Sequence, residues 1–518
     1  TCLSPSRRQR RRTRPPGRQA SVLDSSSVAG TTLAYVLLVL VGLGALPIIA
    51  MGYQFLLIPF HAFRNHYAKA APYLPRVAVV IPAWNEGAVV GTSIDNLMAL
   101  EYPADALRVY VVDDASTDDT PDVVLAKARQ YPGQVFHLRR AKGGEGKAHT
   151  LNHGIAIILE DDWMEALLIM DADVVYLPDS LRKMTRHLAD EKVGAVTAYI
   201  REGSLKKNYL TRFIALEYAL SQAASRRAQN VMGAVACLAG GAQLHSRANL
   251  EELGGRIDTS SLAEDTVTTF KTQLAGRTVV FEPHAVVLAE EPQAVAALWK
   301  QRLRWGRGNV HITRMYRRLW FRKQEGNRLG SLDFGLVWFG VAFQPVAMVL
   351  SSVGLVGLYF LESPVSAQVF RTFWALAACT YVFTMVVTIA LDPVTGRKTL
   401  REAIFFPGLV SVVITVATFF PGLLEEDVPA LLGVELSDGI LRAWTLFVYS
   451  WITLSMVGAW IVKRVDSTRA GRFVSPVLVY LVGYGPILCA ITVDSYVKEL
   501  RHADASWDKT EKTGRILA

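Results

Sequence analysis

Acidic residues recur at the ends of short apolar runs in the middle of the chain. Asp113 and Asp114 follow one such run, and Asp171 and Asp173 follow another. Runs of this kind are typical of buried parallel strands, whose carboxyl ends meet at one edge of a sheet. Carboxylates gathered there repel one another unless a cation lies between them. A hard divalent ion that also binds a diphosphate supplies that charge.

Asp171 and Asp173 are separated by one residue, so a bend after the strand can turn one carboxylate towards a metal while the other stays near the sheet. Taken alone, such a pair is most often a solvated turn, because aspartate is a common turn former. The apolar strand before the pair and the acidic pair at the previous strand end favour a metal site.

A glycine-rich loop, Lys142 to Lys147, has the sequence KGGEGK and resembles a phosphate-binding loop. Ala148 follows Lys147, so the loop lacks the GxxxxGK[ST] pattern, and ATP hydrolysis is unsupported. By itself the loop is explained equally well as a flexible turn with solvated lysines. Beside an acidic cluster, a lysine near a donor diphosphate is the favoured interpretation.

Two further groups come later in the chain. Glu264 and Asp265 follow a glycine-rich stretch, and alone they are typical of a solvated acidic turn. Gln301, Arg304 and Trp305 fall on one face of a helix. A guanidinium suits phosphate oxygens, and an indole face suits the apolar face of a sugar ring. A basic, aromatic helix at a membrane surface is an alternative that is compatible with this role.

The elements that position these residues belong to an α/β domain between about residues 76 and 330, where short apolar runs alternate with helix-like segments. The runs 77–81, 109–112 and 166–170 predict a mostly parallel sheet covered on both faces. Each run ends in the polar residues described above, where open α/β sheets bind their ligands.

Apolar segments flank this domain, in keeping with a hydrophobic content of 51%. The uncharged stretch 31–60 exceeds the roughly 20 residues that cross a bilayer core, and it is too long for a signal peptide. Five later blocks are also long enough to span a membrane: 333–361, 368–391, 403–423, 439–462 and 473–495.

The loops between these blocks alternate in charge. Loops 392–402 and 463–472 are basic, whereas 424–438 is acidic and has no Lys or Arg. The positive-inside rule predicts that both basic loops and, by counting back, the α/β domain face the cytosol. The arginine-rich N-terminus argues for the opposite placement of a single first span. The chain begins with Thr1, and a further upstream span would remove this conflict.

The net charge of +9 is concentrated beside apolar spans, at the N-terminus and around residues 314–323. This placement favours anionic lipid headgroups as partners, and not nucleic acid, because the sequence contains no recognisable nucleic-acid module. The four cysteines lie far apart without a CxxC pair, so neither a zinc site nor a disulfide framework is indicated.

The motifs PAWNE, DDAST, GGEGKAHTLN, DAD, ED and QxxRW occur in this order within a domain flanked by apolar spans. This set resembles the processive family 2 glycosyltransferases, which include hyaluronan, chitin, cellulose and poly-N-acetylglucosamine synthases. The resemblance covers about residues 75–310. It implies a cytosolic α/β domain of GT-A-like fold, joined to α-helical transmembrane segments in an integral protein of the plasma membrane.

The resemblance also implies how the sugar donor, a UDP-sugar, is bound. Asp113 and Asp114, together with Glu86, would contact the uridine part. Lys147 and Asp171 would lie near the diphosphate.

For the reaction itself, the resemblance implies that Asp173 binds Mg²⁺ or Mn²⁺ and that Asp265 removes a proton from the acceptor hydroxyl. Gln301 and Arg304 would hold the leaving diphosphate, and Trp305 would stack under the acceptor sugar at the entrance to a channel. Direct displacement inverts the anomeric centre. The loop 237–241 occupies the place of an acceptor-contacting loop, but its sequence matches no single product.

Three functions remain open. The first, favoured by QxxRW, polymerises a β-linked polysaccharide from a UDP-sugar and moves it across the membrane. The second glycosylates a lipid carrier once, and the third is a binding-only transporter, which has no need of a base. The predicted segments are a disordered tail 1–28, a span 29–65, the transferase domain 75–310, a basic interfacial helix 311–332, five spans in 333–495 and a tail 496–518.

Overall fold

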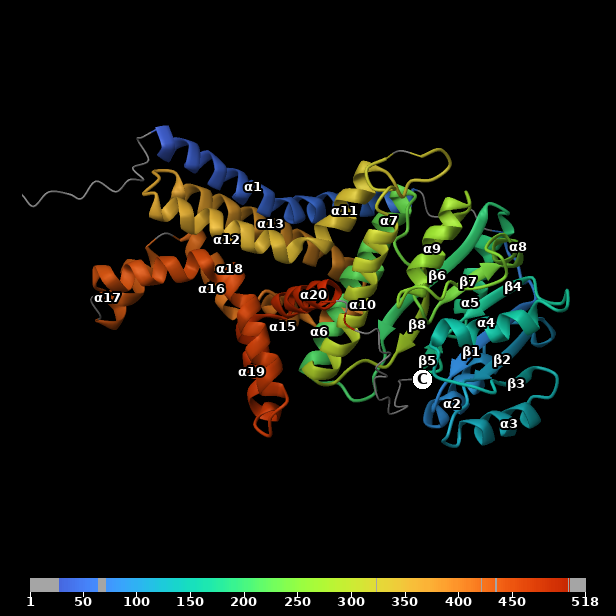
Figure 1. Ribbon diagram of the computed structural model, residues 1–518. Helices are drawn as coiled ribbons and strands as arrows, with labels where there is room; N and C mark the ends of the chain where they lie inside the picture. The colour runs from blue at the N-terminus through green and yellow to red at the C-terminus, as the bar shows by residue number, and fades with distance from the viewer. Residues whose placement is uncertain are drawn as a thin grey trace, which may run out of the picture.

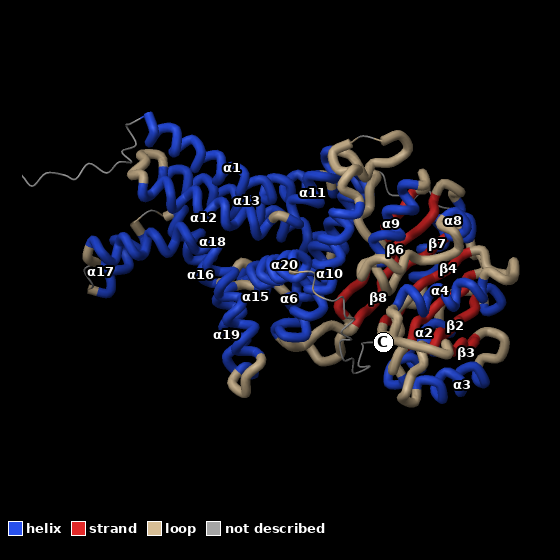
Figure 2. The backbone as a smooth tube through the Cα atoms, viewed as in Figure 1, coloured by secondary structure: helices blue, strands red, loops and turns tan. Residues whose placement is uncertain are grey.

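The structure is a computed structural model that describes residues 28–63, 71–322, 324–420, 422–433, 436–501 and 503. It has two parts, a mixed α/β domain and a bundle of apolar helices, which lie side by side (Figures 1 and 2). The predicted N-terminal tail lies almost wholly outside the described residues, as does the chain after 503. The predicted C-terminal tail from 496 begins as the last turn of a helix that continues to Leu500.

The α/β domain is built on one sheet of eight strands in the order β3-β2-β1-β4-β7-β6-β8-β5. The strands are β1 (Val77–Ala83), β2 (Leu107–Asp113), β3 (Val135–Arg139), β4 (Ala166–Ile169), β5 (Val174–Tyr176), β6 (Val193–Glu202), β7 (Gln243–Ser246) and β8 (Thr278–Ala289).

Four of the seven strand pairings are parallel: β1 with β2, β1 with β4, β2 with β3, and β6 with β8. The pairings β4 with β7, β6 with β7 and β5 with β8 are antiparallel. The prediction of a mostly parallel sheet is therefore confirmed. Because β2, β1 and β4 are parallel neighbours, the polar residues after each of them lie at the same edge.

Strand β1 shows why the sheet is covered on both faces. Val77, Val79 and Ile81 belong to one buried cluster, whereas Ala78 and Val80 belong to another, as expected for side chains that alternate across a strand. Helices α2 (Gly87–Met98) and α3 (Thr120–Gln130) cover the first face, and α4 (Lys147–Ile158) and α8 (Arg247–Glu252) cover the second.

The domain contains further helices, several of which lie between the sheet and the apolar bundle (Figure 1). They are α5 (Ser180–Thr185), α6 (Tyr209–Tyr218), a π-helical turn (Ala219–Ser225), α7 (Arg226–Met232), α9 (Glu264–Leu274) and α10 (Val295–Met315). The last of these, α10, packs along the final helix of the chain, where the Trp299 indole N–H donates a 2.8 Å hydrogen bond to Asp494.

Among the described residues, the apolar bundle contains three helices long enough to cross a membrane: α1 (Val28–Leu56, which continues into a 3-10 turn, Ile58–Ala62), α13 (Ser366–Leu391) and α18 (Asp438–Asp466). Two bent pairs raise this number to five if each pair is one span. They are α11 (Leu332–Ala342) with α12 (Gln344–Phe360), and α19 (Gly471–Val482) with α20 (Tyr484–Leu500). Shorter helices are α14 (Pro393–Lys398), α15 (Leu400–Phe405), α16 (Leu409–Phe419) and α17 (Val428–Leu432), the last preceded by a π-helical turn (Leu423–Asp427).

Three of the predicted spans are not single straight helices. The block 403–423 is divided between α15 and α16, and α16 has only 11 residues. The block 473–495 bends by 95° at Gly483, and the block 333–361 bends by 73°. The physical reason is clearest at Gly408 and Gly483, which both have positive φ and pack backbone against backbone. A Cβ on Gly483 would lie 2.4 Å from the carbonyl carbon of Pro407.

The predicted basic helix over 311–332 is wrong as a separate element. Helix α10 runs without interruption to Met315, and turns follow up to Ser331. Phe321 and Gly326 have positive φ, which a continuing right-handed helix does not allow. Trp320 is buried against aromatic side chains of α9 and α11, and this packing accounts for the turned path.

Candidate active site

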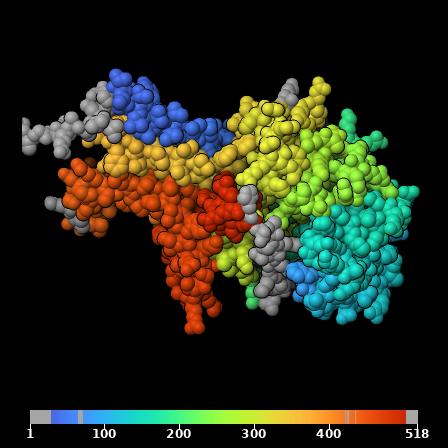
Figure 3. Space-filling model, in the orientation of Figure 1, coloured from blue at the N-terminus to red at the C-terminus, as the bar shows by residue number. Residues whose placement is uncertain are grey.

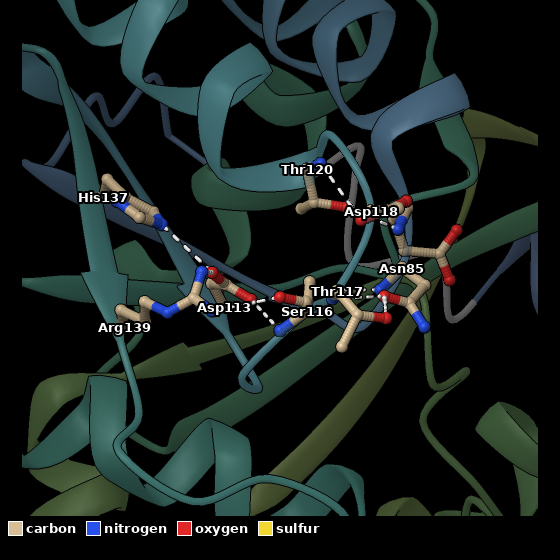
Figure 4. A network of polar contacts seen from close by, with 9 residues as sticks. Asn85, Asp113, Ser116, Thr117, Asp118, Thr120, His137 and Arg139 are labelled. Carbon is tan, nitrogen blue, oxygen red and sulfur yellow. Dashed lines mark hydrogen bonds and ion pairs between the residues drawn. The ribbon is translucent and has the colours of Figure 1, made fainter.

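The loops after β1 and β2 are held together by a polar network at the carboxyl edge of the sheet (Figure 4). The Asn85 side chain accepts a 2.8 Å hydrogen bond from the Thr117 backbone, and the Asn85 backbone N–H donates to Ser116. Asn85 adopts a left-handed conformation, with φ of 55°, which asparagine tolerates better than most residues. Glu86 follows at the start of α2, and its backbone N–H donates to Thr120.

Asp113 is fully buried at the end of β2. Its carboxylate accepts a 2.7 Å hydrogen bond from the Ser116 backbone and forms a 2.7 Å ion pair with Arg139, and His137 lies 3.4 Å away. Arg139 comes from the end of the neighbouring strand β3. Asp113 thus fixes the shape of the loop that follows it.

Asp114 connects the same edge to the glycine-rich loop. Its side chain forms an ion pair with Arg140 and accepts a 2.9 Å hydrogen bond from the Gly144 backbone. A Cβ on Gly143 would lie 2.1 Å from the Asp114 carbonyl oxygen, so this close approach requires glycine. Arg140 also pairs with Glu145. The loop is therefore fastened to the end of β2 and delivers Lys147 to the first turn of α4.

Lys147 is the centre of a cluster of charged residues from distant parts of the chain. Its ammonium group lies 2.5 Å from Asp171 and 3.8 Å from Glu264, and it donates a 3.2 Å hydrogen bond to the Gly240 carbonyl. Burial disfavours the charged ammonium, but the carboxylates of Asp171 and Glu264 outweigh this effect and raise the pKa of Lys147 above its ordinary value. The lysine therefore carries its full charge at the place where strand β4 ends.

Glu264, at the start of α9, behaves differently from a surface carboxylate. Burial raises its pKa to about 7; Lys147 opposes this rise, while the negative charges of Asp265 and Asp171 add to it. Glu264 therefore gains and loses its proton near neutral pH. Its neighbour Asp265 is half-buried, and its carboxylate accepts a 2.7 Å hydrogen bond from the Thr266 backbone.

The loop 237–241 lies between these charged groups. A Cβ on Gly240 would be 3.4 Å from both the Asp265 Oδ2 and the Lys147 Nζ atoms, and a Cβ on Gly241 would be 3.3 Å from Asp171 Oδ2. Lys147, Asp171 and Asp265 therefore surround one short stretch of backbone. The two glycines leave this space free of side chains.

Two residues interact electrostatically with Asp265: Cys237, the first residue of the loop, and Arg226 of α7. Burial, with the adjacent Asp265 carboxylate, raises the pKa of the Cys237 thiol well above its usual range, so this thiol stays protonated. Burial lowers the pKa of Arg226, whereas the negative charge of Asp265 acts in the opposite direction. Asp265 thus has a buried guanidinium and a neutral thiol as neighbours.

The carboxylates of Asp171 and Asp173 fit a divalent cation that binds together with a diphosphate. Both side chains are half-buried in the turn between β4 and β5, and Asp171 is already paired with one positive charge, that of Lys147. In the described part of the chain no group of three or more His, Cys, Asp or Glu side chains could hold a metal by itself. Two carboxylates with phosphate and water oxygens are a usual ligand set for Mg²⁺.

Helix α10 brings the QxxRW residues next to the start of α9. A Cβ on Gly308 would lie 2.7 Å from the Ala263 Cβ, two residues before Asp265. Arg304 precedes Gly308 by four residues and so shares its helix face. Within the described residues, Arg304 makes no hydrogen bond or ion pair. Trp305 is 38% exposed, which leaves its ring accessible to a ligand.

Gln301 is more buried than Arg304 and Trp305, the other two residues of the motif. It is buried, donates a 3.4 Å hydrogen bond to Glu291 and accepts one from Arg302. Arg302 in turn lies 4.1 Å above the Trp305 ring and forms a two-pronged ion pair with Glu217, at 2.9 and 3.0 Å. Gln301 is therefore part of a buried network beneath the tryptophan.

The structure thus gathers Lys147, Asp171, Glu264 and Asp265 around the loop 237–241. It places Asp113 and Asp114 as buried supports of the adjoining loops, with their carboxylates occupied by protein partners.

Sequence reasoning missed several partners of these residues: Arg139, Arg140, Arg226, Glu217 and Arg302. The first two could have been found, because they end the run 135–139 beside an acidic pair that ends the preceding run. The others depend on contacts between helices and give no local signal.

Residues 75–308 match a family model described as "Glycosyltransferase like family 2". The probable glycosyltransferase YdaM of Bacillus subtilis is 28% identical over 333 residues, which are 63% of this chain and 76% of that protein. The beta-monoglucosyldiacylglycerol synthase of Synechocystis is 31% identical over 242 residues, 46% of this chain and 49% of the synthase.

The poly-beta-1,6-N-acetyl-D-glucosamine synthase of Staphylococcus epidermidis is 27% identical over 237 residues, 46% of this chain and 55% of that synthase. The chain therefore spans about half the length of both synthases. Residues 75–308, which form the α/β domain with its mostly parallel sheet, are thus similar to family 2 glycosyltransferases.

Proposed function

We propose that this chain is a membrane-embedded, inverting glycosyltransferase that builds a β-linked polysaccharide from a UDP-sugar and passes it across the plasma membrane. The observation that carries the proposal is the convergence of Lys147, Asp171 and Asp265 on the glycine backbone at 240–241. A positive charge for the diphosphate and a carboxylate for the acceptor hydroxyl thus lie on either side of one open space.

In this proposal Asp265 takes the proton from the acceptor hydroxyl as its oxygen attacks the anomeric carbon. The bond between that carbon and the β-phosphate oxygen breaks, and UDP leaves with its charge balanced by Lys147. Glu86, Asp113 and Asp114 position the loops around the uridine. Asp173, together with Asp171, would hold Mg²⁺ or Mn²⁺, and the bound ion would add positive charge beside the diphosphate.

The arrangement of α10 supports a long acceptor. Trp305 exposes part of its ring one turn from Gly308, which contacts the start of α9, and α10 also packs along α20, with Arg307 paired to Glu499. An aromatic platform at this boundary suits a glycan that leaves the site towards the membrane helices. We assign Arg304 to the leaving diphosphate because its guanidinium is unpaired within the described residues.

A cytosolic orientation is part of the proposal. Both basic loops contact the transferase domain: Tyr199 donates a 2.8 Å hydrogen bond to Asp392, and the Ala296 backbone donates one of 3.0 Å to Asp466. The domain and these loops therefore lie on the same side of the apolar bundle. The positive-inside rule assigns that side to the cytosol.

The test is to offer the purified full chain a panel of UDP-sugars with Mg²⁺ or Mn²⁺ and to measure UDP release, repeating the measurement after chelation. We expect one or a few donors to be hydrolysed or transferred only when the metal is present. No release with any donor would contradict the proposal. Product length, measured with a labelled donor, then distinguishes a polymer from single transfer.

Single transfer to a lipid is the second candidate, because of the 31% identity to a glucosyldiacylglycerol synthase. A radiolabelled product that moves with the lipid fraction and carries one sugar would favour it. A ladder of lengthening glycans would favour polymerisation.

A further inference from the structure

Residues 314–331, which comprise the end of α10 and the turns that lead to α11, carry five exposed arginines, and we call this stretch the arginine segment. None of them makes an ion pair with any described residue, whereas most arginines of the transferase domain do, such as Arg247 and Arg277. The only carboxylate within the segment is Glu325, which is also exposed. The five arginines are Arg314, Arg317, Arg318, Arg322 and Arg328.

Packing and a hydrogen bond of Trp320 hold the arginine segment against the rest of the fold. Trp320 is buried, its ring stacks on Trp338 of α11 at 5.2 Å, and its indole N–H donates a 2.9 Å hydrogen bond to the Thr313 carbonyl. The ring of Phe270 of α9 packs edge-on against Trp320, with centroids 6.1 Å apart. The stretch of chain that carries the arginines is therefore held in place. Mutual repulsion between them favours the binding of anions there.

Arg328 of this segment lines a groove with apolar walls, whereas Arg317 and Arg318 line a neighbouring hollow with Leu274 and Tyr316. A groove of about 690 Å³ between the last turns of α1 and the first turn of α11 is lined by Tyr53, Phe321, Arg328, Leu332 and Leu336, with Asp333 as its one carboxylate. Leu332 is 66% exposed and Phe321 is 50% exposed. In Figure 3 the yellow atoms of this region project beside the end of the blue helix α1.

We propose that the arginine segment and this groove bind anionic phospholipids, with the phosphate headgroup on the arginines and the start of the acyl chains against Phe321, Leu332 and Leu336. A free phosphate or nucleotide would bind the guanidinium groups but leave the apolar wall of the groove exposed. A lipid fits both features, because its headgroup binds the guanidinium groups and its acyl chains cover the apolar wall. The groove also lies at a suitable depth for a lipid headgroup. Helix α1 ends and α11 begins here, where the polar and apolar layers of a bilayer would meet.

The test compares the full chain with a variant that combines Arg317→Gln, Arg318→Gln and Arg322→Gln. The matched control combines Arg129→Gln, Lys192→Gln and Arg256→Gln, which removes the same charge from exposed positions of the transferase domain outside the arginine segment. Each protein is reconstituted in vesicles of phosphatidylcholine with a minor share of phosphatidylglycerol. It is then extracted with its bound lipids, and the ratio of the two lipids is measured by mass spectrometry.

We expect the wild type and the control to retain phosphatidylglycerol several-fold above its share in the vesicle, and the arginine variant to lose most of this enrichment. Enrichment on the wild type should also fall as salt rises, a measurement that does not depend on the variant folding. Equal lipid ratios in all three proteins would overturn the proposal. Displacement of the bound lipid by millimolar inorganic phosphate would assign the site to a free anion instead. None of these outcomes depends on which sugar is transferred.

Discussion

The charged cluster around Lys147 and the buried network around Arg302 contain similar ion pairs but differ in how complete they are. Lys147 pairs directly with Asp171, whose side chain is 37% exposed, beside the open glycine backbone at 240–241. Arg302 is buried, with Glu217 as its ion-pair partner, and Glu217 also accepts a 2.5 Å hydrogen bond from Tyr484. The first arrangement leaves room for a ligand, whereas the second has its polar groups satisfied within the protein.

The difference shows how the domain combines a binding site with attachment to the apolar bundle. A partly exposed, incomplete cluster contributes less to stability than a complete one, because solvent screens its charges and a ligand must compete for them. A buried, complete network fixes one arrangement of α6, α10 and α20. Changes in the first region should therefore affect turnover, and changes in the second should affect stability.

The strongest test of the first region is Asp265→Asn. Removing the proposed base should lower the rate of sugar transfer by about 10²–10⁴-fold, because the amide cannot accept the proton. Donor binding, measured by calorimetry, should be close to that of the wild type. A variant with normal turnover would mean that Asp265 is not the base and would favour a binding-only protein.

The corresponding test of the second region is Arg302→Met. It leaves Glu217 buried without its cation, and breaking a buried pair in this way costs about 3–5 kcal/mol. The midpoint of thermal unfolding should fall clearly. Adding Glu217→Leu to the same chain should recover much of the loss, since no unpaired charge remains. If Arg302→Met alone is as stable as the wild type, the Lys147 cluster and the Arg302 network do not differ in their contribution to stability.

Lys147→Gln is a second test of the open cluster, and we expect it to affect kinetics more than stability. Loss of a charge-assisted contact to the diphosphate should cost about 1.5–3 kcal/mol, or roughly 10- to 100-fold in kcat/KM for the donor. Thermal stability should change little, because Asp171 is partly exposed and can be hydrated. A large loss of stability with unchanged kinetics would place Lys147 in a purely structural role.

The smallest expected effect concerns Glu264, whose pKa burial raises to about 7. A raised pKa means that the folded protein holds this proton while the unfolded chain, near its ordinary value, has lost it. The contribution of Glu264 to the free energy of unfolding is therefore full below pH 4.5 and is lost as pH rises to about 7.

Thermal unfolding of the wild type and of Glu264→Gln across that range measures this contribution. The stability of the wild type relative to the variant should fall between these two pH values and stay constant above them. A difference that does not change with pH would contradict the raised pKa.

The local patterns predicted the α/β domain and the edge where the site lies. Strands that read as unbroken apolar runs are buried on both faces, and the acidic pairs lie at their carboxyl ends. These features depend only on neighbouring residues and on the geometry of parallel strands. The block 403–423 was predicted less well, because composition measures apolarity and not where Pro407 and Gly408 interrupt a helix.

The sequence by itself determined which residue types stand at the strand ends, that the motifs follow one another in the order of a family 2 transferase, and that apolar segments flank them. Only the tertiary structure decided that Glu264 is a half-buried partner of Lys147, that Gln301 faces Glu291, and that the five arginines of the arginine segment have no ion-pair partner among the described residues. The reason is physical. Strand-end chemistry follows from local periodicity, whereas burial and charge pairing between helices depend on packing across more than a hundred residues of chain, as between Lys147 and Glu264.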